Sequence, residues 1–372
     1  MNVLKDSLAP VALFCLLTIG TCTQAIADDS QLFAFKFQTN RPLVYAVSLK
    51  FRTVTDNNIG GKNSLASNTR EFRYKVQLTG YKKNPDGTTL VYFKPYDFAE
   101  DMDNVGLSHV VTQIRGLKIK TQQNGIVIID TENNVGLGQA NTSKISVYPN
   151  LLSGYFNFDP AGRTLKFEGD LPFIDYWTDM FKVRIGFFWI CFPDHPVGIQ
   201  EAWTENISMN PGGGLALDNP LTFTNTFTRG LNLTTTGNPI ATFDVTSADH
   251  LKNISGYSEQ NGQKSSLNIS QYDHILFGTY HFDQKRGVLL DANTTETADI
   301  SIDMLVQGNS ATSHMNSKME IQINLITEPI EPPPKQAQST HFVPRLRVSG
   351  VLPNTRIIPS PSAAFELVSY YR

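Results

Sequence analysis

Alternation of apolar and polar residues dominates the chain. The segments Val44–Phe51 and Glu71–Leu78 change between the two classes at nearly every position, and Phe33, Phe35 and Phe37 share the same spacing. A period of two places apolar side chains on one face of a β-strand and polar side chains on the other. The pattern therefore predicts antiparallel strands with one face on a core and one face in water.

Short turn motifs separate these segments. An Asn-Pro-Asp-Gly sequence at Asn84–Gly87 precedes the apolar run Leu90–Phe93. An Asn-Gly pair at Asn124–Gly125 lies between Leu117–Thr121 and Ile126–Ile129. Proline presets a negative φ, and glycine accepts the positive φ that tight turns need. Both motifs therefore predict β-hairpins.

One phrase occurs twice in the chain. Gly154–Leu165 and Gly278–Leu289 both read Gly, any residue, aromatic, any residue, Phe-Asp, then a short polar stretch with Gly. Aspartate accepts backbone N–H groups at a tight turn, and glycine takes the left-handed residue, so each copy predicts a hairpin with its aromatic residues facing the core. Asn-Pro and Gln-Asn-Gly motifs precede both copies in the same order. This order favours an internal duplication, with two unrelated β-halves as the alternative.

The connection between the two halves has a different pattern. Apolar residues in Leu171–Phe181 recur at helical spacing, Pro172 suits a first turn and Asp170 suits a cap. An apolar run ending at Phe192 follows and reads as a buried strand, and Pro193–Gly198 breaks the pattern. We expect a mainly β protein with two antiparallel sheet halves, residues 28–170 and 196–327, joined by a helix and apolar connector over 171–195.

The N-terminus has the pattern of a signal peptide. Lys5 precedes an apolar run from Leu8 to Ile19, and Ala25–Ala27 forms a small-residue cleavage site, so we expect cleavage after Ala27. The run is shorter than the roughly 20 residues of a membrane span. A lipid anchor at Cys22 is disfavoured because Thr21 precedes it. The pattern predicts an exported protein, periplasmic or extracellular, with no transmembrane segment.

Composition narrows the class further. Hydrophobic residues make up 40% of the chain and charged residues 17%. This hydrophobic content is sufficient for a core. The net charge of −3 gives no reason to expect a nucleic-acid partner. Residues 328–372 are rich in proline and read as a linker and tail. Removal of the leader leaves Cys191 alone, so no internal disulfide forms. Its apolar neighbours predict burial rather than a nucleophile.

No known catalytic motif occurs. The chain has no phosphate loop, dinucleotide fingerprint, zinc-binding helix or nucleophile elbow. The adjacent pairs Asp194–His195, Asp249–His250 and Asp273–His274 place their two side chains on opposite faces of a strand, so we expect no useful contact within them. His281 and Asp283 share a face, which is a weak metal signal. We expect no catalytic residue, no metal and no cofactor.

Two further residue groups have competing interpretations. The acidic residues Glu100, Asp101 and Asp103 could hold calcium, but they lack the glycine-centred spacing of a calcium loop, so we expect a solvated loop. Four aromatic residues could line an apolar pocket, and the alternative is that they pack in the core: Trp177, Phe187, Phe188 and Trp189.

The order of elements resembles an uncharacterised family of secreted bacterial β-proteins. The resemblance rests on Pro196–Trp203, where the family has Pro-Val-x-x-Gly-[Asp/Glu]-x-Trp, and on the hairpin phrase that ends the second half. It covers Val44–Leu325, and Gln200 stands where the family usually has glycine. The resemblance implies location and architecture but no activity. A more distant analogy is to half-barrels that carry lipoproteins or sense lipids in the periplasm.

These observations leave three functional hypotheses. The first is an exported, non-enzymatic binding or envelope-structural protein whose partner is an apolar ligand or an envelope component. The second is a periplasmic carrier of a lipid or other apolar ligand. The third is a hydrolase with an unrecognised site.

Overall fold

The computed structural model describes residues 30–39, 41–105, 107–115, 118–133, 135, 154–168, 190–209, 215–235, 238–260, 263–306 and 309–326. All regular structure in these residues is β, which confirms the mainly β prediction. The leader, the helix expected over Leu171–Phe181 and the proline-rich tail lie outside the described residues. The described part contains no helix long and apolar enough to cross a membrane.

The strands of the described residues form one antiparallel sheet of 17 strands. The strands of the first half are β1 (Leu43–Ile59), β2 (Lys62–Lys83), β3 (Thr89–Asn104), β4 (Ser108–Arg115), β5 (Lys118–Gln123), β6 (Ile126–Asp130), β7 (Gly154–Phe158) and β8 (Thr164–Glu168). The strands of the second half are β9 (Ala202–Met209), β10 (Leu215–Leu217), β11 (Leu221–Arg229), β12 (Leu233–Thr235), β13 (Asn238–Leu251), β14 (Ile254–Gln260), β15 (Gln263–Asp283), β16 (Val288–Val306) and β17 (Asn309–Ile326).

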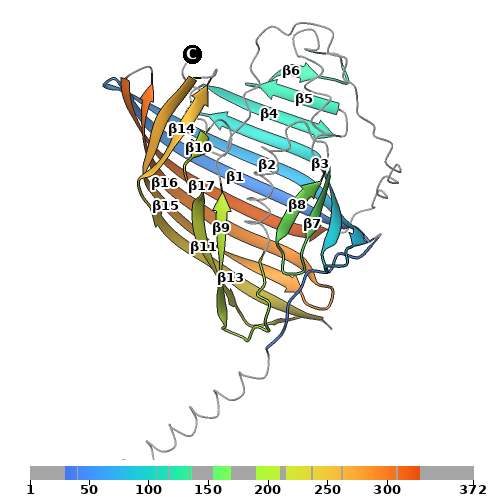
Figure 1. Cartoon of the computed structure of the whole chain (residues 1–372). Helices are drawn as coiled ribbons and strands as arrows, with labels where there is room; N and C mark the ends of the chain where they lie inside the picture. Colours follow the sequence, from blue (N-terminus) through green and yellow to red (C-terminus); the bar gives the residue numbers. More distant parts are fainter. Residues whose placement is uncertain are drawn as a thin grey trace, which may run out of the picture.

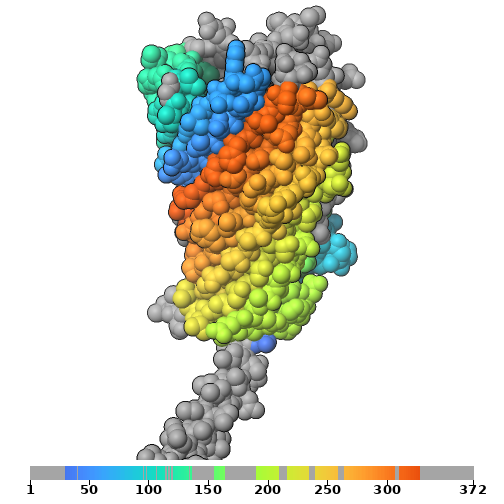
Figure 2. All heavy atoms as spheres, turned by 90° about the vertical axis from the view of Figure 1, so that its left-hand side faces the viewer, coloured from blue at the N-terminus to red at the C-terminus, as the bar shows by residue number. Residues whose placement is uncertain are grey.

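The first and last strands join the halves. β1 and β17 pair antiparallel over their full length, from Val44 opposite Ile326 to Ile59 opposite Ala311. Figure 2 shows this pair on the outside of the molecule, where the blue band of β1 lies beside the red-orange band of β17. The expected division into two sheet halves is therefore corrected to a single sheet. Pairing between strands so distant in sequence leaves no local signal in either strand.

The sheet branches towards both of its edges. β3 pairs with β7 through Thr89–Phe93 and with β4 through Phe98–Asn104. In the same way β15 pairs with β13 through Tyr272–Asp283 and with β14 through Gln263–Ile269. The sheet curls so that β7, β8 and β9 lie in front of the long strands in Figure 1. The two branches thus let one sheet wrap around an interior.

The two faces of the sheet differ in polarity. On β1 the side chains of Tyr45, Val47 and Leu49 are buried, whereas Lys50 and Arg52 are exposed. We call the buried side the inner face and the other side the outer face. This alternation continues on β11, β13 and β17. The predicted pattern of one apolar and one polar face is confirmed.

An aromatic cluster, the plug, fills one end of the interior. It consists of Phe33, Phe35, Phe158, Phe192, Phe243 and Phe282, which stack or meet edge to face. The Phe35 ring lies 5.3 Å from the Phe158 ring and 5.2 Å from the Phe282 ring, in both cases edge to face. The plug therefore joins both copies of the repeated phrase through one side chain.

The segment that carries Phe33, Phe35 and Phe37 is extended but belongs to no strand. The Phe35 N–H donates to the Pro160 carbonyl (2.7 Å), and the Lys36 N–H donates to the Gly287 carbonyl (2.9 Å). Pro160 and Gly287 belong to the turns of the two repeated phrases. The predicted strand is therefore wrong. The segment lies between the two turns, and its N–H groups donate to carbonyls of those turns.

Both copies of the phrase fold as the predicted hairpins, β7–β8 and β15–β16. Asp159 and Asp283 each accept a backbone N–H of their own turn. Gly162 and Gly287 have positive φ values of 102° and 65°. The hairpins predicted at Asn84–Gly87 and Asn124–Gly125 also form, as β2–β3 and β5–β6.

The strands around the two hairpins follow the same order. The series β1-β2-β3-β7-β8 in the first half corresponds to β9-β11-β13-β15-β16 in the second. The registers also agree: Val91 lies opposite Phe156 and Phe93 opposite Gly154, as Phe243 lies opposite Tyr280 and Val245 opposite Gly278.

The sheet edges meet at the plug end of the molecule. Arg163, which precedes β8, places Nη2 2.5 Å from Oε1 of Glu205 on β9. The Trp203 Nε1–H donates to the carbonyl of the buried Cys191 (2.7 Å). Ile190, Cys191 and Phe192 are buried but form no strand, so the predicted burial is confirmed and the predicted strand is wrong for these residues. Gln200 takes a φ of +64°, so the turn before Trp203 forms without glycine.

Candidate functional site

A cluster of polar side chains lies on the inner face of the second half. We call it the His274 cluster, and it consists of Ser247 and Asp249 on β13, His274 on β15 and Thr294 and Glu296 on β16. Inner-face alternation places these residues inside, because the residues between them are on the outer face. Such a group is unusual in an interior that is otherwise apolar, since buried polar groups cost free energy unless they are paired.

Strand register brings the charged residues together. Gln260 lies opposite Gln263 at the β14–β15 hairpin, and the same register continues along β15 until Asp249 lies opposite His274. On the other side of β15, Leu276 lies opposite Glu296. Glu296 is thus diagonal to His274. The imidazole lies between two carboxylates that come from two different neighbouring strands.

Each ring nitrogen of His274 faces one carboxylate. Nδ1 lies 3.4 Å from Oδ2 of Asp249, and Nε2 lies 3.3 Å from Oε1 of Glu296. The imidazole is fully buried, and the two carboxylates are 13% and 12% exposed. The ring of Phe223 covers the imidazole with its centroid 4.5 Å away. Water is therefore largely excluded from both contacts.

Asp249 is held by further donors. Its Oδ1 accepts the Thr224 backbone N–H (3.1 Å), and its Oδ2 accepts the Ser247 hydroxyl (2.5 Å). The Ser247 hydroxyl thus bonds the carboxylate and not the imidazole. Both ring nitrogens already face carboxylates, so His274 is not placed to take a proton from Ser247. The group lacks the order of partners that a serine hydrolase needs.

Two oxygens of the cluster have no hydrogen-bond partner among the described residues. They are Oε2 of Glu296 and Oγ1 of Thr294, and both are inaccessible to solvent. Thr294 is 2% exposed and lies two residues before Glu296 on the same face of β16. Burial raises the pKa of Tyr272 well above its usual range, and the nearby Glu296 carboxylate raises it further. The cluster therefore has more acceptors than donors and carries negative charge.

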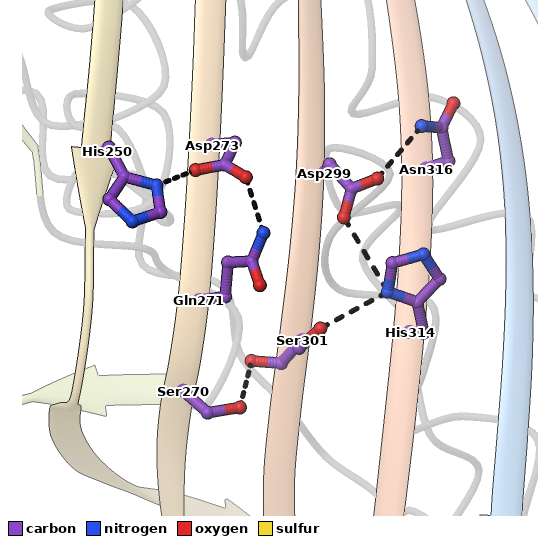
Figure 3. A network of polar contacts seen from close by, with 8 residues as sticks. All are labelled: His250, Ser270, Gln271, Asp273, Asp299, Ser301, His314 and Asn316. Atoms are coloured by element: carbon purple, nitrogen blue, oxygen red, sulfur yellow. Dashed lines mark hydrogen bonds and ion pairs between the residues drawn. The ribbon is translucent and has the colours of Figure 1, made fainter.

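The outer face carries a second polar network, which Figure 3 shows. His250 contacts Asp273 across β13 and β15, and Gln271 donates to the same carboxylate (2.5 Å). Two strands further, His314 Nδ1 lies 3.6 Å from Oδ1 of Asp299 and 3.2 Å from the Ser301 hydroxyl. These side chains are partly or fully exposed, so each pair contributes little to stability.

The expectation of no useful contact within the adjacent Asp-His pairs is confirmed for the two that lie in strands, but these two pairs contact each other. Within each pair the side chains do point to opposite faces, but Asp249–His250 and Asp273–His274 lie opposite each other on neighbouring strands. These two residue pairs therefore form one His–Asp contact on the inner face and one on the outer face. The sequence contains part of the necessary signal, because an Asn-Gly motif follows Gln260, and the register that pairs Gln260 with Gln263 also pairs 249 with 274.

The other two groups of candidate metal ligands have partners within the protein. His281 contacts Asp291 at 2.7 Å, whereas Asp283 is buried and accepts the Arg286 N–H at 2.8 Å, so the two residues have separate partners. The acidic residues Glu100, Asp101 and Asp103 lie in β3 and not in a loop. Glu100 pairs with Arg70 and Asp101 with His109, since the strand turns them to different partners. Among the described residues, no three His, Cys, Asp or Glu groups are placed to hold a metal ion.

The remaining predicted residues have separate outcomes. Trp177, Phe187, Phe188 and Trp189, the expected pocket lining, lie outside the described residues. Cys191 is buried, as expected, and burial raises the pKa of its thiol to about 12.

A hollow of about 390 Å³ opens where β11 separates from β13. The ladder between these strands runs only from Thr226 opposite Thr246 to Arg229 opposite Phe243. Beyond it, the hollow is lined by Pro220, Thr222, Leu251 and Ile254 among others. The Thr224–Asp249 hydrogen bond bridges the strands between the ladder and the hollow. The acidic cluster thus lies beside a gap in the sheet.

Comparison with known proteins gives no family. No sequence family matches the chain, and no curated protein matches it. A solved structure titled "Lipid-protein interactions in lipovitellin" is similar at 10% identity with a TM-score of 0.39, covering 82% of this chain and 27% of that one. The translocator domain of the autotransporter NalP from Neisseria meningitidis is similar at 8% identity with a TM-score of 0.13, covering 84% and 97%. This chain spans about a quarter of the lipovitellin chain.

Proposed function

We propose that this protein binds an apolar or amphipathic ligand on the inner face of its sheet and catalyses no reaction. One observation carries the proposal: the apolar inner face continues beyond the plug, and its side chains there are only partly buried. They include Phe72, Tyr74, Met304, Met319 and Leu325. Partly exposed apolar side chains on a curved face are typical of ligand-binding surfaces.

The make-up of this surface suits a flexible ligand. Met319 on β17 lies opposite Phe51 on β1 and opposite Glu296 on β16. Methionine is unbranched and polarisable, so it adapts to ligands of different shape. The outer face of the same strand carries polar and charged residues such as Lys318, Glu320 and Gln322. A ligand with an acyl chain therefore has apolar neighbours on one side of the sheet only.

Binding is tested on the full chain by two measurements. Native mass spectrometry after gentle purification is expected to show a mass excess that organic extraction removes. A fluorescent acyl probe is expected to bind, and Met319→Arg on the inner face should weaken its binding at least about tenfold, since it places a charge in an apolar site. Gln322→Arg, on the outer face of the same strand, is the matched control and should bind as the parent does. A protein that carries no extra mass and does not bind the probe would contradict the proposal.

The proposal includes export of the protein. It rests on the leader pattern that ends at Ala25–Ala27. The resemblance to secreted bacterial β-proteins through Pro196–Trp203 belongs to the same proposal. N-terminal sequencing of the protein from its native cell is expected to begin at Asp28. A chain that retains Met1 would refute export by this leader.

The proposal also includes an internal duplication. The equal order of five strands and the equal register around the two hairpins support it. The leading segments of the two halves also exchange partners, because Lys36 donates to the Gly287 carbonyl and Phe192 donates to the Ala161 carbonyl. Superposition of β1–β3 with β7 and β8 on β9, β11, β13, β15 and β16 is the test. If residues at matching places in the two registers do not superpose, the result would favour two unrelated halves.

A further inference from the structure

We infer that the His274 cluster binds the cationic head of an amphipathic ligand, an alkylammonium group, while the alkyl chain lies on the adjoining apolar inner face. This inference rests on the proposed function, because it specifies which ligand the inner face takes. The observation behind it is the pair of buried oxygens on β16 that have no partner among the described residues.

The unpartnered oxygens define what the ligand must bring. Oε2 of Glu296 only accepts hydrogen bonds when the carboxylate is ionised, and the Thr294 hydroxyl has two acceptor lone pairs. Buried acceptors without donors are costly, so a ligand that donates hydrogen bonds stabilises the site. An ammonium group has three donors and no acceptor, as in lysine, which suits two oxygens two residues apart on one strand face.

The charges around Glu296 point in the same direction. One imidazole lies between two carboxylates, Asp249 and Glu296, so the acidic groups of the cluster outnumber its one basic group. Neighbouring inner-face residues on adjacent strands form a row that includes Glu296 and, among the described residues, the cationic Arg70. Arg70 is paired with Glu100. Along that row Arg70 is opposite Phe51, Phe51 opposite Met319, and Met319 opposite Glu296. A carboxylate head would thus meet repulsion at Glu296, and a cationic head would meet attraction.

The neighbouring strand provides the place for the alkyl chain. Glu296 lies opposite Met319, and Thr294 lies opposite Ile321, both on β17. Phe51 follows on β1. A ligand whose head group lies at Glu296 therefore has apolar side chains directly beside it. Its alkyl chain reaches them without crossing a polar residue.

Three probes with the same chain length separate the possible outcomes: dodecylamine, dodecanol and dodecanoate. Each competes with the fluorescent acyl probe for the full-length parent protein at neutral pH. We expect dodecylamine to bind at least about tenfold more tightly than dodecanol, the factor expected for one hydrogen bond to a charged group, and dodecanoate to bind most weakly. Equal binding of the three would overturn this inference and leave the proposed function standing. Failure of all three to bind would contradict the proposed function itself.

Variants test the assigned residues. Glu296→Gln is expected to reduce the preference for dodecylamine over dodecanol to less than about threefold, and Thr294→Val to reduce it partly. Glu320→Gln, on the exposed outer face of β17, is the matched control and should keep the full preference. Thermal unfolding of each variant identifies loss of fold. If folded Glu296→Gln protein keeps the parent's preference, the head group binds elsewhere and the inference is wrong.

Discussion

Asp249 and His274 lie opposite each other on β13 and β15 inside the sheet, and their chain neighbours His250 and Asp273 form the same contact outside it. The two contacts use the same residue types, strands and register. They differ in the face of the sheet and hence in their exposure to water, and the buried imidazole also contacts Glu296. This arrangement is an internal control for the effect of burial on a His–Asp pair.

Removal of the buried histidine is expected to destabilise the fold strongly. His274→Ala leaves Asp249 and Glu296 buried without the group between them, at a cost of about 3–5 kcal/mol. His250→Ala breaks only an exposed pair and should cost about 0–1 kcal/mol. Urea unfolding of both variants measures the difference. If both variants lose the same free energy of unfolding, the inner pair is not buried as the structure shows.

Much of the fold follows from local patterns. Alternation predicts the faces of β1 and β2, and turn residues predict the hairpins at Asn84–Gly87 and Asn124–Gly125, because these features depend on neighbours in the chain. The β1–β17 ladder has no such signal, since it joins residues at opposite ends of the fold. The His274 cluster lies between these cases. Its register follows from the hairpin near Gln260, but recognition of Glu296 also requires the register shifts along β15 and β16.

The plug is expected to be the most sensitive part of the core. Phe158→Ala and Phe282→Ala should each lower the free energy of unfolding by about 3–5 kcal/mol, since both rings are buried and contact Phe35. The control is Phe277→Ala on the outer face of β15, where the side chain is 52% exposed and the cost should be small. Denaturant titrations provide the values. A cost below about 1 kcal/mol at Phe158 would argue against the plug.

A glycine at position 200 is expected to stabilise the protein. Gln200 has a φ of +64°, which a residue with a Cβ adopts only at a cost. Gln200→Gly removes this cost, and after the entropy that glycine adds to the unfolded chain we expect a gain of about 0.5–1 kcal/mol. Gln200→Ala keeps the unfavourable φ and should give no gain. Thermal unfolding that ranks alanine at or above glycine would contradict the assigned backbone conformation.

The Cys191 thiol is expected to be inert in the native protein. Burial raises its pKa to about 12, and the Glu205 carboxylate contributes in the same direction, so almost no thiolate exists at pH 8. Labelling with a thiol reagent at pH 8 should therefore follow unfolding when urea is added. Because the folded pKa lies above the unfolded one, this group's contribution to stability is full below about pH 9 and is lost as pH rises towards 12. Rapid labelling without denaturant would refute the burial.

The outer pair gives a prediction at acid pH. A side-chain hydrogen bond from His250, followed by one from Gln271, holds the pKa of Asp273 below its usual value. The contribution of this carboxylate to stability is therefore present above its unfolded pKa and lost as pH falls through the folded pKa. Carbon-detected NMR titration of the Asp273 carboxyl is expected to show the low value in the parent protein and a return towards the ordinary value in His250→Ala. An unchanged titration in the variant would assign the shift to another group.

The ladder between β1 and β17 has a consequence for how the chain is made. Val44 finds its partner Ile326 only after nearly all of the described chain has been synthesised. Until then β1 and β16 each have a free edge, and such edges pair readily with other chains. High contact order slows folding, which prolongs this exposure. Completion of the sheet must therefore wait for the last strand, and the unfinished chain is exposed to aggregation until that strand pairs.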